Sequence, residues 1–395
     1  MKPTLRLLTL SLALFAATGV AAATKPNTLT PQEVAEGWLL LFDGESTFGW
    51  APRGDAKWEV ADGAVCSHQG AGNGLLSTTT EFADYVLKVD FWLDEKANSG
   101  VFLRSPATGE ITSANAYEVN LCDAHEKWPT GSISEVTRVT GRPKTVGAWS
   151  TLEITADKDR LMVRLNGQAV VDARDSKHGR GTIALQQLNG LGEGRFRNLK
   201  LRPLGLKSLF DDKALTGWKV IPGHKSVYSV TPEGWLNVKD GNGDLQSEGE
   251  YGDFLFQLEI FSNGDHLNSG VFFRAIRDQF WSGYESQIRN EWKGDDRSKP
   301  VDYGTGGIYN RQPARRVVSR DREWFTMTIA AHGPHLTTWV NGFQVTDFTD
   351  TRPPNENARQ GYRAKPGVLS LQGHDPTTDL SFRKLRIVEL PPARN

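Results

Sequence analysis

The stretch NSGVFLR at 98–104 returns as NSGVFFR at 268–274, a distance of 170 residues along the chain. Six of the seven positions are identical, and the exchanged pair is Leu103 and Phe273. Each run is short, rich in apolar and aromatic residues, and preceded by turn-forming residues, which is typical of a β-strand. A recurrence at this distance predicts two whole copies of one β-rich domain rather than a solenoid.

Further blocks recur in the same order. They pair LFDG (41–44) with LFDD (209–212), YE (117–118) with YE (284–285), LNG (165–167) with VNG (340–342), and FR (196–197) with FR (382–383). Because the offset drifts upward along the chain, the second copy carries loop insertions. We place the boundary at 203–205 and expect a first domain over 30–204 (copy one) and a second over 206–391 (copy two).

Strand patterns dominate both copies. Residues 85–92 and 254–260 alternate or run apolar over strand lengths. Asn166-Gly167 predicts a tight hairpin, because its turn needs positive φ values. Thr30, Pro31 and Glu33 predict one short capped helix at the start of copy one. Many short strands with almost no helical periodicity predict an all-β protein with a sandwich or jelly roll in each copy.

Composition limits the functional classes. The 395 residues carry a net charge of −1 without blocks of like charge, which argues against a nucleic-acid or membrane-surface role. Residues 1–23 have the basic start, apolar run and small-residue exit of a secretory signal peptide, with a single membrane anchor as the weaker alternative. We therefore expect a periplasmic or secreted protein without membrane insertion. The two cysteines, Cys66 and Cys122, are either bridged or free.

Both copies resemble the 3-keto-disaccharide hydrolase family, formerly a domain of unknown function. In copy two the resemblance rests on GYESQI (283–288), GTGGIY (304–309), PAR (313–315) and LQGHDP (371–376). In copy one YEVNL (117–121), TGSI (130–133) and FRN (196–198) match, but no His follows Leu185-Gln186. The resemblance implies two tandem concanavalin A-like jelly-roll β-sandwich domains. It also implies an exported enzyme that cleaves glycosides or disaccharides already oxidised at C3 of the sugar.

Strand alternation predicts which polar side chains of copy two share a groove. Glu285 and Gln287 alternate with apolar neighbours, as do Gln372 and His374. We predict Glu285, His374 and Arg274 as catalytic groups. Substrate-binding candidates in copy two are Gln287, Gln372, Asp375, Arg311, Arg315, Trp281 and Trp292.

By the same alternation, copy one presents Glu118 as a catalytic candidate, with Arg104 and Asn120 as substrate-binding candidates. Asp123 and His125 are candidate metal ligands; a divalent ion stays open as a cofactor, although no spacing requires one. Structural alternatives exist for these groups. Glu285 would then only pair with Arg274, the arginines would bind backbone carbonyls, and the histidines would occupy turns.

Family-sixteen glycosidases carry carboxylates at positions i, i+2 and i+5 of a comparable strand. Here those positions read Glu118, Asn120 and Asp123 in copy one, whereas copy two keeps only Glu285. The carboxylate pair of ordinary glycoside hydrolysis is thus depleted. Cleavage of a 3-keto sugar does not need this carboxylate pair, because the ketone acidifies the C2 proton. We therefore predict proton abstraction at C2, elimination of the C1 substituent, and addition of water for net hydrolysis.

Two alternatives remain open. The same fold makes lectins, so a pair of carbohydrate-binding modules without catalysis is the rival from another class. A third hypothesis assigns catalysis to copy two and binding to copy one, because only copy two has a His after the Leu-Gln pair.

Overall fold

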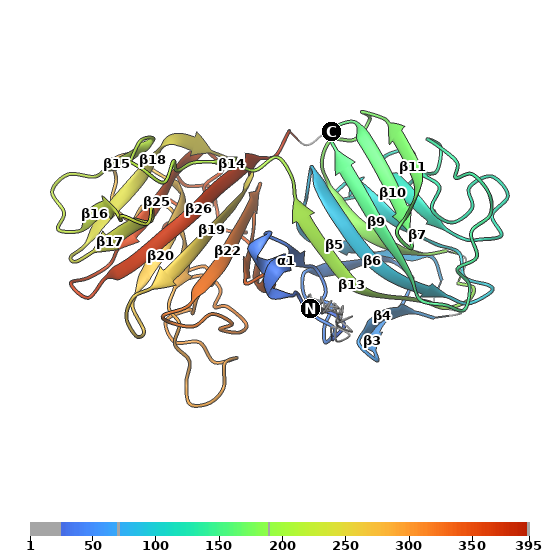
Figure 1. The fold of residues 1–395 in the computed structure, drawn as a ribbon, viewed down its shortest axis with the longest axis horizontal. Helices are drawn as coiled ribbons and strands as arrows, with labels where there is room; N and C mark the ends of the chain where they lie inside the picture. Colours follow the sequence, from blue (N-terminus) through green and yellow to red (C-terminus); the bar gives the residue numbers. More distant parts are fainter. Residues whose placement is uncertain (1–24, 69–71, 189, 393–395) are drawn as a thin grey trace, which may run out of the picture.

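The computed structural model describes residues 25–68, 72–188 and 190–392 as two β-sandwiches side by side (Figure 1). The predicted signal peptide lies outside the described residues. In the ranges that are described, no helix has the length and hydropathy to cross a bilayer. The one α-helix, α1 (Pro31–Ala35), begins as expected: the Thr30 side chain accepts from Glu33 N, and the Glu33 side chain accepts from Thr30 N.

Each copy contributes one half of a large back sheet. The strands of copy one, in spatial order, are β11 (Gln168–Arg174), β10 (Arg160–Leu165), β9 (Ser150–Asp157), β6 (Tyr85–Leu93), β13 (Gly194–Pro203) and β1 (Leu39–Leu40), with β3 (Trp58–Ala61) and β4 (Ala64–Ser67) beside β13. Those of copy two are β24 (Phe343–Thr349), β23 (His335–Val340), β22 (Trp324–His332), β19 (Phe254–Ser262), β26 (Asp379–Glu389), β17 (Leu236–Lys239) and β16 (Val227–Val230), with β14 (Lys207–Ser208) on β26.

A five-stranded front sheet completes each sandwich. In copy one its order is β2 (Trp50–Gly54), β5 (Gly74–Thr78), β12 (Thr182–Gln187), β7 (Ser99–Ser105) and β8 (Tyr117–Leu121). In copy two it is β15 (Trp218–Val220), β18 (Gly243–Tyr251), β25 (Gly367–Gly373), β20 (Ser269–Ala275) and β21 (Tyr284–Ile288). The two orders correspond strand for strand, as expected of the duplicated jelly roll.

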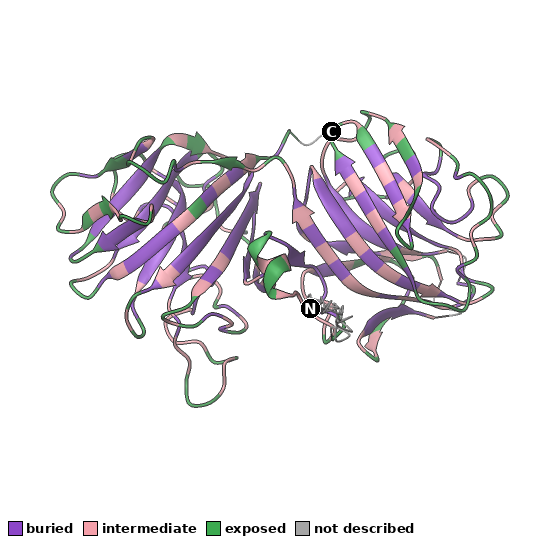
Figure 2. Cartoon of the chain, in the orientation of Figure 1, coloured by how far each residue is buried: buried purple, intermediate pink, exposed green. Residues whose placement is uncertain are grey.

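Each sandwich encloses an apolar core, and Figure 2 shows buried residues along the strands of both sheets. The repeated strands β7 and β20 are buried at every position. Val101 and Val271 belong to the two main cores. The predicted hairpin is confirmed: Asn166 and Gly167 have φ of 49° and 81° and join β10 to β11. Both cysteines are free, Cys66 buried in β4 and Cys122 directly after β8.

The two copies are tied to each other. Strand β1 pairs antiparallel with β13 and parallel with β24, so the back sheets form one continuous sheet of sixteen strands. Buried charge crosses the same boundary: Arg180 lies 2.8 Å from Glu81 and 2.9 Å from Asp253 of copy two. The front sheets remain separate. Each therefore presents its own outer face to a ligand.

Candidate active site in copy two

Strand β21 places a carboxylate on the outer face of the front sheet. Tyr284 and Ile288 join the core, so the intervening Glu285 and Gln287 point outward, as the alternation predicts. Glu285 is only 4 % exposed. Gly270 on the neighbouring strand makes room for it, because a Cβ there would lie 2.5 Å from Glu285 Oε1. The strand pair therefore holds a buried carboxylate in a fixed place.

A guanidinium that the sequence did not indicate faces this carboxylate. Arg359 Nη2 donates to Glu285 Oε2 at 2.6 Å, and Arg359 Nε donates to Trp281 O at 3.3 Å. Burial raises the pKa of Glu285 to about 7; Arg359 and then His374 pull it down, but do not cancel the effect of burial. Glu285 can thus exchange a proton near neutral pH.

His374 follows β25 and borders the same cavity. Its Nδ1 lies 2.8 Å from Asp375 Oδ2, and its Nε2 lies 3.4 Å from Asn268 Nδ2. The carboxylate at Nδ1 and the amide donor at Nε2 fit the tautomer with its proton on Nδ1. In that tautomer Nε2 is a proton acceptor. Asp375, a substrate-binding candidate from the sequence, is not among the lining residues of the cavity; its carboxylate instead orients the ring of His374.

Amide and acid side chains form the opposite wall. Gln287 Nε2 donates to Asn268 Oδ1 at 3.1 Å and to Asp302 Oδ2 at 2.9 Å, and Asn268 Nδ2 donates to Asp302 at 2.9 Å. Three buried polar atoms that also line the cavity have no hydrogen-bond partner within the described residues. They are Gln287 Oε1, Gln372 Oε1 and Trp281 Nε1. Such atoms suit the hydroxyl groups of a sugar.

The cavity between these groups is small. Its volume is about 60 Å³, room for a few water molecules and far below the roughly 300 Å³ at the lower end of ligand pockets. Its lining residues are Asn268, Trp281, Glu285, Gln287, Asp302, Tyr309, Arg359, Gln372 and His374. Arg359 covers Glu285 from the solvent side, since its own side chain is 25 % exposed.

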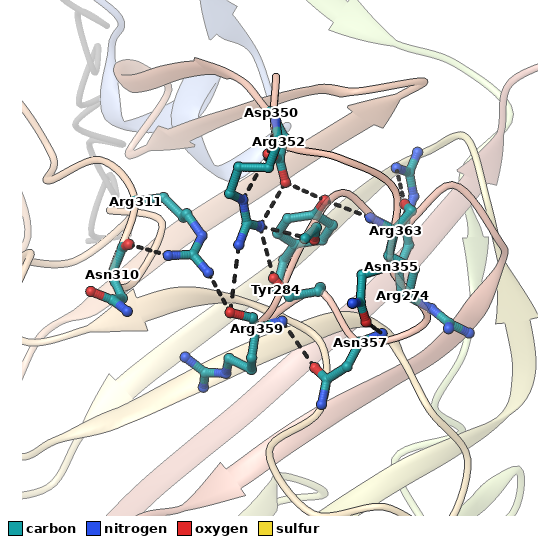
Figure 3. A network of polar contacts seen from close by, with 12 residues as sticks. Arg274, Tyr284, Asn310, Arg311, Asp350, Arg352, Asn355, Asn357, Arg359 and Arg363 are labelled. Atoms are coloured by element: carbon teal, nitrogen blue, oxygen red, sulfur yellow. Dashed lines mark hydrogen bonds and ion pairs between the residues drawn. The ribbon is translucent and has the colours of Figure 1, made fainter.

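Arg359 projects from the segment 350–366 between β24 and β25, which we call the arm (Figure 3). Tyr284 donates to Asp350 at 2.7 Å and accepts from Arg363 N at 3.0 Å, which ties the arm to β21. Arg311 Nη2 donates to Arg359 O at 2.7 Å. Copy one has only 175–181 at the corresponding place. The backbone of Arg359 is therefore held in place, and its side chain reaches Glu285 from a fixed base.

The expectation that Arg274 and Arg104 face the groove is wrong. Arg274 donates to Gly252 O, Gly333 O, Arg363 O and Asp253, and Arg104 donates to Ala83 O, Lys158 O, His178 O and Asp84. Both arginines have positive φ, 48° and 51°, where the register with the neighbouring strand shifts. The bulge breaks the alternation on which the prediction depended. Both side chains instead donate hydrogen bonds to backbone carbonyl groups.

Three other binding candidates lie elsewhere. Arg315 binds Asp43 of copy one at 2.7 Å and so bridges the copies. Arg311 supports the arm, as described above. The Trp292 ring lies outside the lining of the cavity, and its centroid is 4.0 Å from Arg297 Cζ. All three belong to loops, where strand alternation gives no information about direction.

Trp281 borders the cavity, and its ring already packs against other rings. One face stacks on Phe280, with ring centroids 4.5 Å apart, and the ring is nearly parallel to His374 at 5.6 Å. His224 extends the stack beyond Phe280 at 4.3 Å. Stacking of Trp281 on a sugar stays a prediction; in the structure its ring belongs to a stack that runs from His224 through Phe280 to His374.

The corresponding face of copy one carries an open cleft of about 620 Å³. Glu118 and Asn120 line it, as the alternation predicts, together with Gln186. Burial raises the pKa of Glu118, and the Ser134 hydroxyl offsets this only in part. Leu188 stands where copy two has His374, and no arginine is within ion-pair distance of Glu118 in the described ranges.

The predicted metal candidates of copy one have structural partners. Asp123 accepts from Thr130 Oγ1 at 2.6 Å and from Thr145 N and Oγ1. His125 Nδ1 accepts from Trp128 N at 2.9 Å. Over the described part of the chain, no group of three or more His, Cys, Asp or Glu side chains is arranged to hold a metal ion. Asp123 and His125 therefore fold the loop after β8.

Four site residues were missed by the sequence reasoning. Asn268 and Tyr309 lie inside recurring or family-like blocks, so their position was a usable signal. Asp302 and Arg359 lie in loop insertions of copy two without a matching residue in copy one, and nothing in the pattern singles them out. Only the folded loops bring them to β21.

The model of one protein family, described as the 3-keto-alpha-glucoside-1,2-lyase-like domain, matches residues 37–202 and again 205–388. A solved structure from Parabacteroides distasonis, provisionally described as a glycosyl hydrolase, shares 21 % identity at a TM-score of 0.41 and covers 46 % of this chain and 100 % of its own. Carbohydrate-binding module CBM66 from Bacillus subtilis shares 20 % identity at a TM-score of 0.32, covering 38 % and 94 %. No match was found among curated proteins.

Proposed function

This chain belongs to the family of 3-keto-alpha-glucoside-1,2-lyase-like domains and acts on carbohydrates, and we propose that it is an exported enzyme that cleaves 3-keto-glycosides at copy two. The observation that carries the proposal is the buried Glu285 carboxylate, whose pKa of about 7 suits a general base, opposite the Arg359 guanidinium. A base and a fixed cation are the two groups that enolate chemistry requires.

The first step is proton removal. Glu285 takes the C2 proton, and the electron pair moves into a C2–C3 double bond with negative charge on the C3 oxygen. Arg359 leaves Glu285 and holds that oxygen, so its charge is used where negative charge develops. The enolate then collapses to the ketone, a C1–C2 double bond forms, and the C1–O bond breaks. Glu285 returns its proton to the departing oxygen.

Water addition completes net hydrolysis. His374 has an acceptor at Nε2 and accepts a proton from the water that adds at C1. The enolate forms again on Arg359, and the protonated His374 delivers that proton to C2. Asp375 stabilises the imidazolium during this exchange. Atoms balance: one water is consumed, and one C1–O bond is broken.

The small size of the cavity sets a condition on substrate entry. A sugar ring fits only if the Arg359 side chain swings off Glu285, because about 60 Å³ holds a few waters. The backbone of the arm is bound by Arg311 and Tyr284 contacts, so the movement required is one of the side chain. Binding of the 3-keto group and release of the base are thereby coupled.

The test uses the purified full chain with a 3-keto-disaccharide and with its unoxidised parent, measuring released monosaccharide. We expect cleavage of the 3-keto substrate alone. Glu285→Gln should lower turnover by roughly 10² or more, while the matched change Glu118→Gln in copy one should leave turnover within about twofold. Equal cleavage of both substrates contradicts the elimination mechanism. The reverse ranking of the two variants would move the reaction to copy one.

Export is part of the proposal and is supported by the basic and apolar pattern of residues 1–23. Edman sequencing of the protein recovered from the producing cell should begin at Thr24. A chain that keeps Met1 would contradict export by this route.

A further inference from the structure

The copy one cleft differs from the copy two site in size and in chemistry. We infer that this cleft is a separate binding site for neutral, unoxidised oligosaccharides, which it holds without cleaving. The inference goes beyond the proposed reaction and does not depend on it. Its volume of about 620 Å³ lies within the roughly 300–1,000 Å³ of pockets that enclose small ligands. No movement of a covering side chain is needed for entry.

The cleft is lined by groups that bind hydroxyls. Asn98, Asn120 and Gln186 contribute amides, and Trp128 contributes aromatic surface. Gln186 Oε1 and Asn98 Oδ1 are buried without a hydrogen-bond partner in the ranges the structure describes. Buried acceptors of this kind are costly unless a ligand donor pairs with them. A hydroxyl-rich ring over an aromatic side chain meets both requirements.

Charge selects a neutral ligand. Arg53 already donates to Pro106 O and Ala107 O, and Lys127 is paired with Glu135 at 3.1 Å. Glu110, Glu118 and Glu135 add carboxyl groups to the lining. Among the described lining residues Arg53 is the one arginine, and its guanidinium already donates to backbone carbonyls, whereas three glutamates line the same cleft; their carboxylates repel a uronate or a phosphate.

As far as the structure describes it, copy one lacks a cation beside its carboxylate, and we therefore expect no cleavage there. In copy two the base faces Arg359 at 2.6 Å and shares its cavity with His374. In copy one the equivalent positions hold Leu188 and the short segment 175–181, and the Ser134 hydroxyl is the polar neighbour of Glu118. In the described residues no arginine or lysine lies within ion-pair distance of Glu118, so an enolate formed beside it would have no counter-charge in contact. Glu118 is left as a hydrogen-bonding group.

Calorimetric titration of the Glu285→Gln chain tests the site in the absence of turnover. The probes are maltose, cellobiose and a disaccharide that contains glucuronic acid. We expect one of the neutral disaccharides to bind at one site per chain and the uronate to bind at least about tenfold more weakly. Absence of binding by both neutral disaccharides overturns the inference.

Matched variants locate the binding. Trp128→Ala, on an outer loop, and Gln186→Leu, which keeps side-chain size, should each weaken the neutral disaccharide by about tenfold or more. Gln372→Leu, the matched change in copy two, should leave that affinity unchanged. Binding that follows Gln372 instead, or cleavage of a 3-keto-disaccharide that survives Glu285→Gln and is lost with Glu118→Gln, overturns the inference. If the protein does not cleave 3-keto-disaccharides but the disaccharide affinities are as expected, the proposed function fails and this inference stands.

Discussion

Replacing Arg359 with Gln should move the acid limb of the pH profile of kcat/KM, which reports the free enzyme, to higher pH. Glu285 must be ionised to act as the base, and its pKa is about 7 with Arg359 in contact. A contacting cation lowers a carboxyl pKa by about 1 to 3 units, so the variant should place it at about 8 to 10. At pH 7 the ionised fraction would fall from about half to about a tenth or less.

A second effect separates the two roles of Arg359. Because the same guanidinium holds the enolate oxygen, the plateau of kcat at high pH should also fall, by roughly 10². The assay is kcat/KM and kcat for a 3-keto-disaccharide over roughly pH 5 to 10. The matched control is Arg316→Gln, which removes an exposed positive charge from the same copy and should leave the profile in place.

The position of the acid limb shows whether Arg359 acts on the ionisation of Glu285. A lower plateau with an unmoved acid limb would mean that Arg359 does not act on the base, and that the 2.6 Å contact with Glu285 is not kept in solution. A limb that moves to lower pH would refute the electrostatic reasoning altogether.

Three further outcomes are expected. Gly270→Ala should lower turnover strongly, since the new Cβ would lie 2.5 Å from Glu285 Oε1, whereas the matched Gly100→Ala should spare it; equal losses would contradict this. Burial lowers the pKa of His332 to about 3, so between about pH 6.5 and 3 the unfolded chain binds a proton that the folded chain does not. The free energy of unfolding should therefore fall as the pH drops through that window. Thermal melting should show a smaller fall in His332→Gln. Arg180→Met leaves the buried Glu81 carboxylate without its ion-pair partner, while Asp253 keeps Arg274, and should lower Tm by several degrees, an effect that an unchanged melt would disprove.

The duplicated fold could be predicted because its signals are local. Strand runs, the Asn166-Gly167 turn and the Thr30 capping box each depend on neighbouring residues, and all three are confirmed. Glu285 and Gln287 were placed correctly for the same reason, since alternation within a strand depends only on the strand itself.

The prediction failed where the backbone leaves the regular strand. Arg274 has a positive φ at a bulge, so its side chain turns to the carbonyls of Gly252 and Gly333. A bulge is one extra residue and has no reliable sequence pattern. Arg359 supplies the cation instead, from an arm whose path is fixed by tertiary contacts with Tyr284. Such contacts cannot be read from spacing along the chain.

The most direct test of the central claim is the fate of the C2 proton. The purified protein acts on a 3-keto-disaccharide in deuterated water, and the released 3-keto sugar is examined by NMR before it exchanges without enzyme. We predict deuterium at C2 in each product molecule, with cleavage and label both formed more slowly, by roughly 10² or more, in Glu285→Gln. Cleavage that leaves the original hydrogen at C2 would contradict proton abstraction by Glu285 and with it the elimination mechanism.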